Sequence, residues 1–173
     1  RRRTLRAAQG AAMIHVRPAL PLDTRSMAQL LNEIIKIGGT TALVRPVTGQ
    51  DMAEWMNFVP DRAAWHVALD GEERVVGFQW IEPSQQLPPE AAEIATFVQV
   101  GQTGLGIGSA LFTATANAAK ELGYVWIRAN IRADNEGGLT YYQSRGFRDY
   151  AVIEDYIMAD GTSVDKRLKR YDI

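Results

Sequence analysis

Cysteine is absent from this 173-residue sequence, and histidine occurs only twice, as His15 and His66. The lack of cysteine excludes a disulfide scaffold, a thiolate nucleophile and a cysteine zinc site. Two histidines so far apart in the sequence do not make the cluster that a histidine metal site needs. No metal site is therefore predicted.

A strong charge of either sign and a long apolar run are missing as well. The formal net charge is −1, so nothing points to a nucleic-acid partner. No stretch approaches the roughly 20 apolar residues of a membrane span. We therefore expect a cytoplasmic protein with neither nucleic-acid nor membrane partners, and a homodimer stays open. With 46% hydrophobic residues, the chain suits one domain with a full core.

The first twelve residues differ from the rest. Residues 1–12 carry four arginines and no acidic residue, whereas the remainder is acidic overall. A strand pattern begins only near Met13. We expect residues 1–12 to be a disordered basic extension or a remnant of cloning, and residues 13–173 to form a single domain.

The stretch around which the chain is organised joins an apolar run over 94–100 to a glycine turn and a helix-period pattern. The glycines are Gly101, Gly104, Gly106 and Gly108, and the helix face consists of Ile107, Leu111, Ala114, Ala118 and Leu122. Backbone N–H groups at such a turn have no intrahelical partner and lie at the positive end of the helix dipole. Because glycine lets a ligand approach the backbone closely, the turn predicts an anion site for a phosphorylated ligand.

Two common phosphate-binding motifs do not match this turn. A P-loop needs a lysine that closes the turn, and there is none. A dinucleotide fingerprint needs a third glycine, but Ser109 stands there, and the next apolar run ends in Asn130 rather than in a carboxylate.

A third possible phosphorylated ligand is coenzyme A. Two motifs in the sequence resemble the coenzyme A-binding motifs of the GNAT acetyltransferase superfamily. The first is Thr103-Gly104-Leu105-Gly106-Ile107-Gly108 followed by Ser109, which is similar to the acyl-CoA motif of that family. The second is Asn135-Glu136-Gly137-Gly138-Leu139-Thr140-Tyr141-Tyr142 followed by Arg145-Gly146-Phe147. Two departures are present: Thr103 stands where the family has Gln or Arg, with Gln102 as a substitute contact, and Gly138 replaces an alanine.

The remaining patterns predict a β-α-α-β-β-β-α-β-α-β-β order. Asp23 and Thr48 are the expected N-caps of the first two helices, and Asp70-Gly71 is a hairpin turn. The expected strands are 13–17, 65–69, 75–81, 91–100, 124–131, 147–158 and 164–171. This order resembles the α/β GNAT acyl-CoA N-acyltransferase fold, a mixed central sheet of six to seven strands flanked by helices. Residues 32–41 and Trp55 also resemble, loosely, the phosphinothricin-type amino-acid N-acetyltransferases.

The resemblance implies roles for several residues. Acetyl-CoA is the implied co-substrate, bound by Thr103, Gly104, Gly106, Gly108, Ser109 and Asn135, with the main chain of Val98 and Val100 polarising the thioester carbonyl. Tyr142 matches the family's general acid, and with an ordinary pKa near 10 it is protonated at neutral pH. Asn135 also suits the N-cap of the short helix that follows it.

A carboxylate is needed to take a proton from the amine. Glu93, near the start of the strand that leads to the glycine turn, is the first candidate, because burial in a partly apolar cleft raises the pKa of a carboxyl. Strand alternation puts Glu93 on the same face as Ala95 and Phe97. Glu82 is the reserve candidate, and His66 is more distant.

The acceptor is less determined than the donor. Trp55, Phe58, Trp65 and Trp80 either line a pocket or belong to the core, and Arg45, Arg62 and Arg74 are candidates for an acceptor carboxylate. The leading hypothesis is an acetyl-CoA-dependent N-acetyltransferase for a primary amine of a small molecule, such as an amino acid or analogue. The alternatives are a catalytically silent acyl-CoA-binding module and a protein N-terminal acetyltransferase.

Overall fold

The computed structural model describes residues 14–102 and 106–173. The predicted basic extension, residues 1–12, lies outside these ranges, as do two predicted cofactor contacts, Thr103 and Gly104. Within the described ranges, seven strands form one mixed sheet in the order β1-β2-β3-β4-β5-β7-β6. The strands are His15–Pro18 (β1), Ala64–Leu69 (β2), Val75–Glu82 (β3), Ala91–Val98 (β4), Trp126–Arg132 (β5), Arg148–Ile157 (β6) and Ser163–Asp172 (β7). The predicted α/β fold with a mixed sheet is confirmed.

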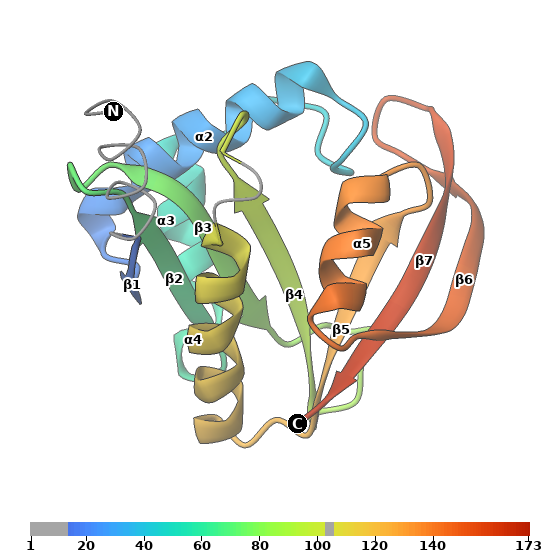
Figure 1. Ribbon diagram of the computed structural model, residues 1–173. Helices are drawn as coiled ribbons and strands as arrows, with labels where there is room; N and C mark the ends of the chain where they lie inside the picture. The colour runs from blue at the N-terminus through green and yellow to red at the C-terminus, as the bar shows by residue number, and fades with distance from the viewer. Residues whose placement is uncertain (1–13, 103–105) are drawn as a thin grey trace, which may run out of the picture.

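Helices cover both faces of the sheet (Figure 1). They are α2 (Thr24–Ile37), α3 (Gly49–Phe58), α4 (Ile107–Glu121) and α5 (Glu136–Ser144), with short 3₁₀ turns at Pro21–Asp23 and Pro60–Arg62. One core cluster joins α2 and α3 to the face that carries Phe78 and Trp80. Two other clusters join α4 and α5 to the opposite face, which carries Ile81 and Ile94.

The first two helices show how local sequence sets their ends. Gly38, with φ of +75°, ends α2 in a backbone conformation that favours glycine. Thr48 caps α3 as predicted: its Oγ1 accepts a hydrogen bond from the N–H of Asp51, whose carboxylate accepts one from the N–H of Thr48. Asp23 occupies the predicted N-cap position of α2, but its side chain makes no capping hydrogen bond with that helix. Its buried carboxylate instead accepts hydrogen bonds from Arg17 and from the N–H of Leu20, which ties the first strand to the start of α2.

Strands β4 and β5 pair in parallel for only part of their length. Their register runs from Ala91 opposite Trp126 to Ile94 opposite Ala129 and then stops. Beyond this point β4 stays with β3 as far as Val98, while β5 stays with β7 as far as Arg132. The sheet therefore splits between its central strands.

Strand β6 forms an exposed edge of the sheet. Nearly all of its side chains are exposed, and it pairs with β7 through a hairpin with two register shifts. No helix in the two described ranges is long and apolar enough to cross a bilayer.

Candidate active site

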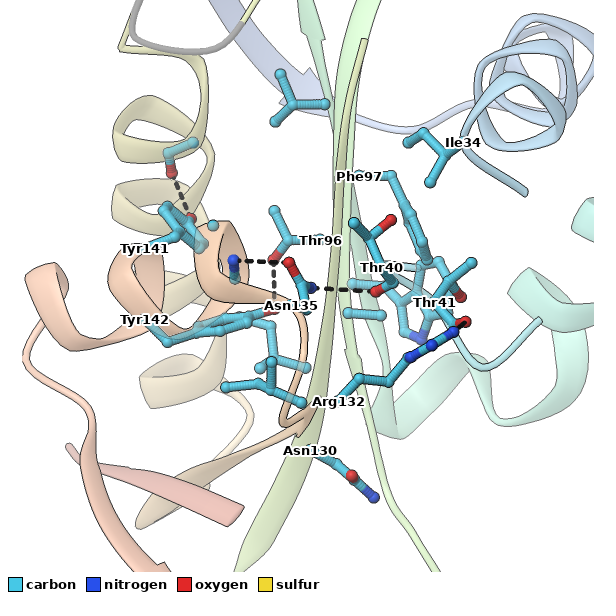
Figure 2. A pocket seen from close by; sticks show the side chains of 18 of the residues that line it. Ile34, Thr40, Thr41, Thr96, Phe97, Asn130, Arg132, Asn135, Tyr141 and Tyr142 are labelled. Atoms are coloured by element: carbon cyan, nitrogen blue, oxygen red, sulfur yellow. Dashed lines mark hydrogen bonds between the residues drawn. The ribbon is translucent and has the colours of Figure 1, made fainter. Parts of the chain in front are cut away.

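The split between β4 and β5 opens into a cavity of about 1130 Å³. Its walls come from both strands, from α5, from the start of α4 and from the loop that follows α2. Figure 2 shows Tyr141 and Tyr142 on one side of β4, with Phe97 and Arg132 on the other. The two sides differ in chemistry.

On the side of α5, neutral polar groups form a hydrogen-bonded network. The Nε2 of Gln79, a fully buried residue of β3, donates to Thr96 Oγ1 at 2.8 Å and to the Tyr141 hydroxyl at 3.0 Å. The Tyr141 hydroxyl donates to the carbonyl of Gly108 at 2.7 Å. The hydroxyls of Thr96 and Tyr142 are 2.7 Å apart (Figure 2). The network thus links β3, β4, α5 and the first turn of α4.

Tyr142 lies at the end of this network and lines the cavity. The residue is only 7% exposed, and burial raises the pKa of its hydroxyl well above the ordinary value, against the opposing effect of the hydrogen bond with Thr96. The hydroxyl is therefore protonated at neutral pH and able to donate. Tyr141 also lines the cavity and makes two hydrogen bonds.

On the other side of β4, charged residues form the cavity floor. Glu93 Oε2 accepts a hydrogen bond of 2.6 Å from Arg128 Nε, and the Arg128 guanidinium also donates to Gln86. Burial raises the pKa of the Glu93 carboxyl despite the neighbouring Arg128. Glu82 is the cross-strand neighbour of Glu93, and burial, with the Glu93 charge, raises its pKa as well.

Lys166 of β7 adds a cation to this floor. The residue is 8% exposed, and its ammonium lies 3.7 Å from the centroid of the Tyr156 ring. Burial lowers the pKa of Lys166, while the charge of Glu93 opposes this shift. Among the described residues, neither Lys166 nor Glu82 has an oppositely charged side chain at salt-bridge distance.

The main chain of β4 also faces the cavity. The N–H of Gln99 donates to the carbonyl of Val76 in β3, and alternation along the strand therefore turns the N–H groups of Thr96 and Val98 toward β5. The strand ends at Val98, two residues earlier than predicted. Val100 lies beyond it, lines the cavity and is half exposed.

The glycine turn is described from Gly106 onward. Gly106 precedes α4 with φ of +79°, a conformation that favours glycine. A Cβ at Gly108 would lie 2.6 Å from the Tyr141 ring, so this glycine allows α5 to approach α4 closely. Ser109 Oγ accepts a hydrogen bond from Arg145 of the second motif. The residues of both motifs that lie in the described ranges therefore meet at one end of the cavity.

Asn135 joins the two rims of the cleft. Its side-chain oxygen accepts a hydrogen bond from the N–H of Gly138, so the predicted N-cap of α5 is confirmed. Its Nδ2 donates to the carbonyl of Thr40 at 3.1 Å (Figure 2). A Cβ at Gly138 would lie 2.5 Å from that nitrogen. The glycine that departs from the family motif thus leaves room for the bridging side chain.

The acceptor residues were predicted less well. Trp55, Phe58 and Trp80 line the cavity, whereas Trp65 stacks on Trp80 within the core. The prediction that Arg45, Arg62 or Arg74 binds an acceptor carboxylate is wrong, because none of them is among the residues that line the cavity. Arg62 lies against Tyr124, and Arg74 pairs with Asp70 in the hairpin turn. The cations that line the cavity are instead Arg132, Arg145 and Lys166.

Four residues of the site were missed by the sequence analysis: Gln79, Thr96, Arg128 and Lys166. They come from four different strands, and the contacts among them and with Glu93 are not local in sequence. Gln79 did carry a signal, because it is a lone polar residue inside the apolar run of β3. Such a residue in a buried strand requires polar partners.

Comparison with known proteins assigns the protein to a family. Residues 28–147, well over half of the chain, match the model of the acetyltransferase (GNAT) family. The chain is 29% identical over 146 residues to a phosphinothricin N-acetyltransferase of Streptomyces coelicolor, which covers 80% of this chain and 84% of that relative. The protein belongs to the GNAT acetyltransferase family.

Solved structures agree with this assignment at the level of the fold. A phosphinothricin acetyltransferase from Sinorhizobium meliloti in complex with acetyl-CoA superposes with a TM-score of 0.83 at 20% identity, over 93% of this chain and 89% of that one. A ribosomal-protein-alanine N-acetyltransferase from Brucella melitensis gives the same TM-score at 19% identity, over 92% and 99% of the two chains. Family membership confirms the predicted class, an acetyl-CoA-dependent N-acetyltransferase. Neighbours with different acceptors share the fold, so the fold does not select the acceptor.

Proposed function

We propose that the protein transfers the acetyl group of acetyl-CoA to the primary amine of a small zwitterionic acceptor, an amino acid or a close analogue. Transfer occurs by direct attack while both substrates are bound. The observation that carries this proposal is a pair of ionisable groups on the cavity floor, the Glu82 carboxyl and the Lys166 amine, neither of which has an oppositely charged side chain at salt-bridge distance among the described residues. An amino acid brings the two complementary charges, an ammonium and a carboxylate.

The cofactor end of the cavity supports the donor substrate. Gly106, Gly108 and Ser109 stand at the N-terminus of α4, where free N–H groups and the helix dipole favour the phosphates of coenzyme A. Asn135 lines the same cavity. Thr103, Gly104 and Val100 complete the proposed contact set. The cavity volume of about 1130 Å³ leaves room for an acceptor beside the pantetheine arm.

Acyl transfer needs a neutral amine and a polarised carbonyl. Glu93, directly or through a water, accepts a proton from the acceptor ammonium, and Glu82 holds that ammonium beside it. The amine nitrogen then attacks the thioester carbon, and the carbonyl electron pair moves to oxygen. The N–H of Val98, turned toward the cleft, donates to this oxygen.

Collapse of the oxyanion breaks the carbon–sulfur bond. The departing sulfur takes the electron pair of that bond and receives a proton from the Tyr142 hydroxyl. A second proton leaves the acylated nitrogen for solvent, and Glu93 releases the first proton to solvent. The products are a neutral amide and the free thiol of coenzyme A, and Tyr142 recovers its proton from water.

The test is thiol release from acetyl-CoA with a panel of amines, with each product identified by mass spectrometry. The panel pairs phosphinothricin and several α-amino acids with their carboxamides, and adds a simple alkylamine, a polyamine and an N-terminally free peptide. We expect turnover with a carboxylated acceptor and a higher KM for its amide. Turnover with the peptide alone would favour an N-terminal acetyltransferase, and binding of acetyl-CoA without any turnover would favour a silent acyl-CoA-binding module.

A further inference from the structure

Gln79 and Thr96 form a chain of hydrogen bonds that ends at the Tyr142 hydroxyl. Gln79 is fully buried within β3, and Thr96 lies opposite it on β4. Their side chains lie on the face of the sheet that packs against α4 and α5. These hydrogen bonds thus reach Tyr142 from the interior of the sheet, while Tyr142 itself lines the cavity.

The direction of these hydrogen bonds follows from the number of protons that each group can donate. The single proton of the Tyr141 hydroxyl is donated to the carbonyl of Gly108, so this hydroxyl can only accept from Gln79. Gln79 must therefore present its NH₂ group, and the second N–H of that group donates to Thr96 Oγ1.

Thr96 then has one proton left. Among the described residues, the Tyr142 hydroxyl at 2.7 Å is the remaining partner for it. If Thr96 donates, the Tyr142 oxygen is the acceptor and its own proton is free to point into the cavity. If Tyr142 donates instead, the Thr96 proton is left without a partner among the described residues, which is unfavourable for a half-buried hydroxyl. The first arrangement satisfies more groups.

We propose that Gln79 and Thr96 are positioning residues that turn the Tyr142 proton toward the sulfur of the departing coenzyme A. This inference rests on the proposed function. In the transfer step the O–H bond of Tyr142 breaks, its electron pair stays on the phenolic oxygen, and the proton forms the S–H bond of free coenzyme A. The phenolate that remains accepts the Thr96 hydrogen bond until water returns a proton.

Burial makes this support necessary. A phenolate in a water-poor site is strongly disfavoured, and the hydrogen bond from Thr96 opposes the rise that burial causes in the Tyr142 pKa. The neighbouring Tyr141 and the charge of Glu93, on the other side of β4, both make the ionisation of Tyr142 less favourable. Thr96 is therefore the group that stabilises the charge that develops on Tyr142.

The test compares two changes at one position. Thr96→Val keeps the shape of the side chain but removes the hydroxyl, and we expect kcat to fall about tenfold to a hundredfold, the range of a hydrogen bond to a charged group. The affinity for acetyl-CoA, measured by calorimetry, should change little. Thr96→Ser restores the hydroxyl and should recover most of kcat. Thr115→Val is the matched control, because Thr115 is a fully buried threonine of α4 whose hydroxyl has no partner among the described residues.

A double-mutant cycle separates positioning from packing. If Thr96 acts through the Tyr142 hydroxyl, Thr96→Val should lower kcat less than about twofold in a Tyr142→Phe background. An equal loss in both backgrounds, or full kcat in the single variant, would overturn the inference while the proposed acetyl transfer stands. Absence of acetyl transfer by the unmodified protein would count against the proposed function itself.

A second variant tests the direction of the chain. Gln79→Glu has nearly the same shape, but an ionised carboxylate can only accept, which draws the Thr96 proton away from Tyr142. We expect kcat to fall at least tenfold at a pH where this carboxyl is ionised, and to recover as the carboxyl is protonated. A pH-independent kcat equal to that of the unmodified protein would overturn the assigned direction. Circular dichroism establishes that the variant is folded, and the Thr96 pair decides the matter by itself if it is not.

Discussion

The two sides of strand β4 present opposite kinds of polar chemistry to one cavity. On the side of α5, the hydroxyls of Thr96, Tyr141 and Tyr142 and the amide of Gln79 are uncharged and linked by hydrogen bonds. On the other side, Glu93 is one of several ionised groups. Strand β4 contributes to both sides, because alternation along the strand turns Thr96 one way and Glu93 the other.

This difference teaches how one cleft can donate and accept protons at the same pH. The neutral network keeps its tyrosine protonated, since burial opposes the phenolate. On the charged floor, the hydrogen bond from Arg128 favours the ionised form of Glu93, while burial raises the pKa of its carboxyl. In the proposed mechanism Tyr142 is the acid and Glu93 is the base.

The largest expected effect removes the donor of the neutral side. Tyr142→Phe should lower kcat by about a hundredfold or more, since general acid catalysis contributes at least that much. The dissociation constant of acetyl-CoA, measured by calorimetry, should stay nearly constant because a proton donor acts mainly in the transition state. The control is Tyr124→Phe, because Tyr124 is a buried tyrosine outside the cavity whose hydroxyl donates to the backbone carbonyl of Arg62. Unchanged kcat in Tyr142→Phe would reduce Tyr142 to a packing residue.

The next effect removes the proton acceptor of the charged side. An alkyl ammonium with a pKa of about 10.4 is less than about a thousandth neutral at pH 7, so its transfer depends on a base. Glu93→Gln should therefore slow an alkylamine acceptor about tenfold to a hundredfold at pH 7, and raising the pH should restore much of the rate. The measurement is kcat/KM between pH 6 and pH 10.

Two comparisons sharpen this prediction. In the unmodified protein, kcat/KM should fall on acidification through the raised pKa of Glu93, at a pH above that of an ordinary glutamate, because only the deprotonated form accepts a proton. Glu93→Gln should lose this acid limb, whereas Glu82→Gln should mainly raise the KM of the acceptor. A deficit of Glu93→Gln that stays constant up to the alkaline limit would transfer the role of base to Glu82.

A smaller effect concerns the specificity of the charged side. Lys166→Met should raise the KM of a carboxylated acceptor about tenfold, because it removes one charged contact, and leave the KM of the matching decarboxylated amine unchanged. Lys120→Met, on an exposed helix surface, is the control variant. Equal KM changes for the two acceptors would mean that Lys166 supports the fold rather than the acceptor.

The smallest effect tests the close packing on the neutral side. Gly108→Ala places a methyl group against the Tyr141 ring, so we expect a loss of about 1 kcal/mol of stability and a several-fold weaker affinity for acetyl-CoA. Gly137→Ala is its counterpart, because a Cβ there meets only the Asn135 side chain at 3.9 Å and alanine favours helices. In thermal unfolding, Gly108→Ala should therefore lower the melting temperature, whereas Gly137→Ala should raise it. Equal melting temperatures would show that α5 moves away from α4 at little cost.

Much of this fold could be predicted because its signals are local. The glycine turn, the N-cap at Thr48 and the hairpin at Asp70 each lie within a few residues, and each was recognised. The roles of Tyr142 and Glu93 remain proposals that their positions in the cavity support. Asp23 stands at the N-cap position of α2 as predicted, but its carboxylate accepts from Arg17 and from the N–H of Leu20 instead of from α2.

The unpredicted part of the site depends on pairing between strands. Arg128 reaches Glu93 only because β4 and β5 are parallel neighbours in one register, and Lys166 reaches the cavity floor only because β7 lies beside β5. A shift of one residue in either register would turn these side chains to the other face. The three candidate arginines were chosen by residue type alone, and type does not determine which face or which end of the sheet a side chain occupies.

The short join between β4 and β5 also bears on how the molecule is assembled. Strands β2, β3 and β4 are sequential antiparallel neighbours, and β6 and β7 form a hairpin, so these pairings join segments that are close in sequence. The join between the halves spans four register pairs and must wait until the chain has passed through all of α4. Because the entropy of loop closure is lost before such contacts form, non-local parallel joins slow folding. We therefore expect the local pairings of β2 with β3 and of β6 with β7 to form before the cleft between β4 and β5 is completed.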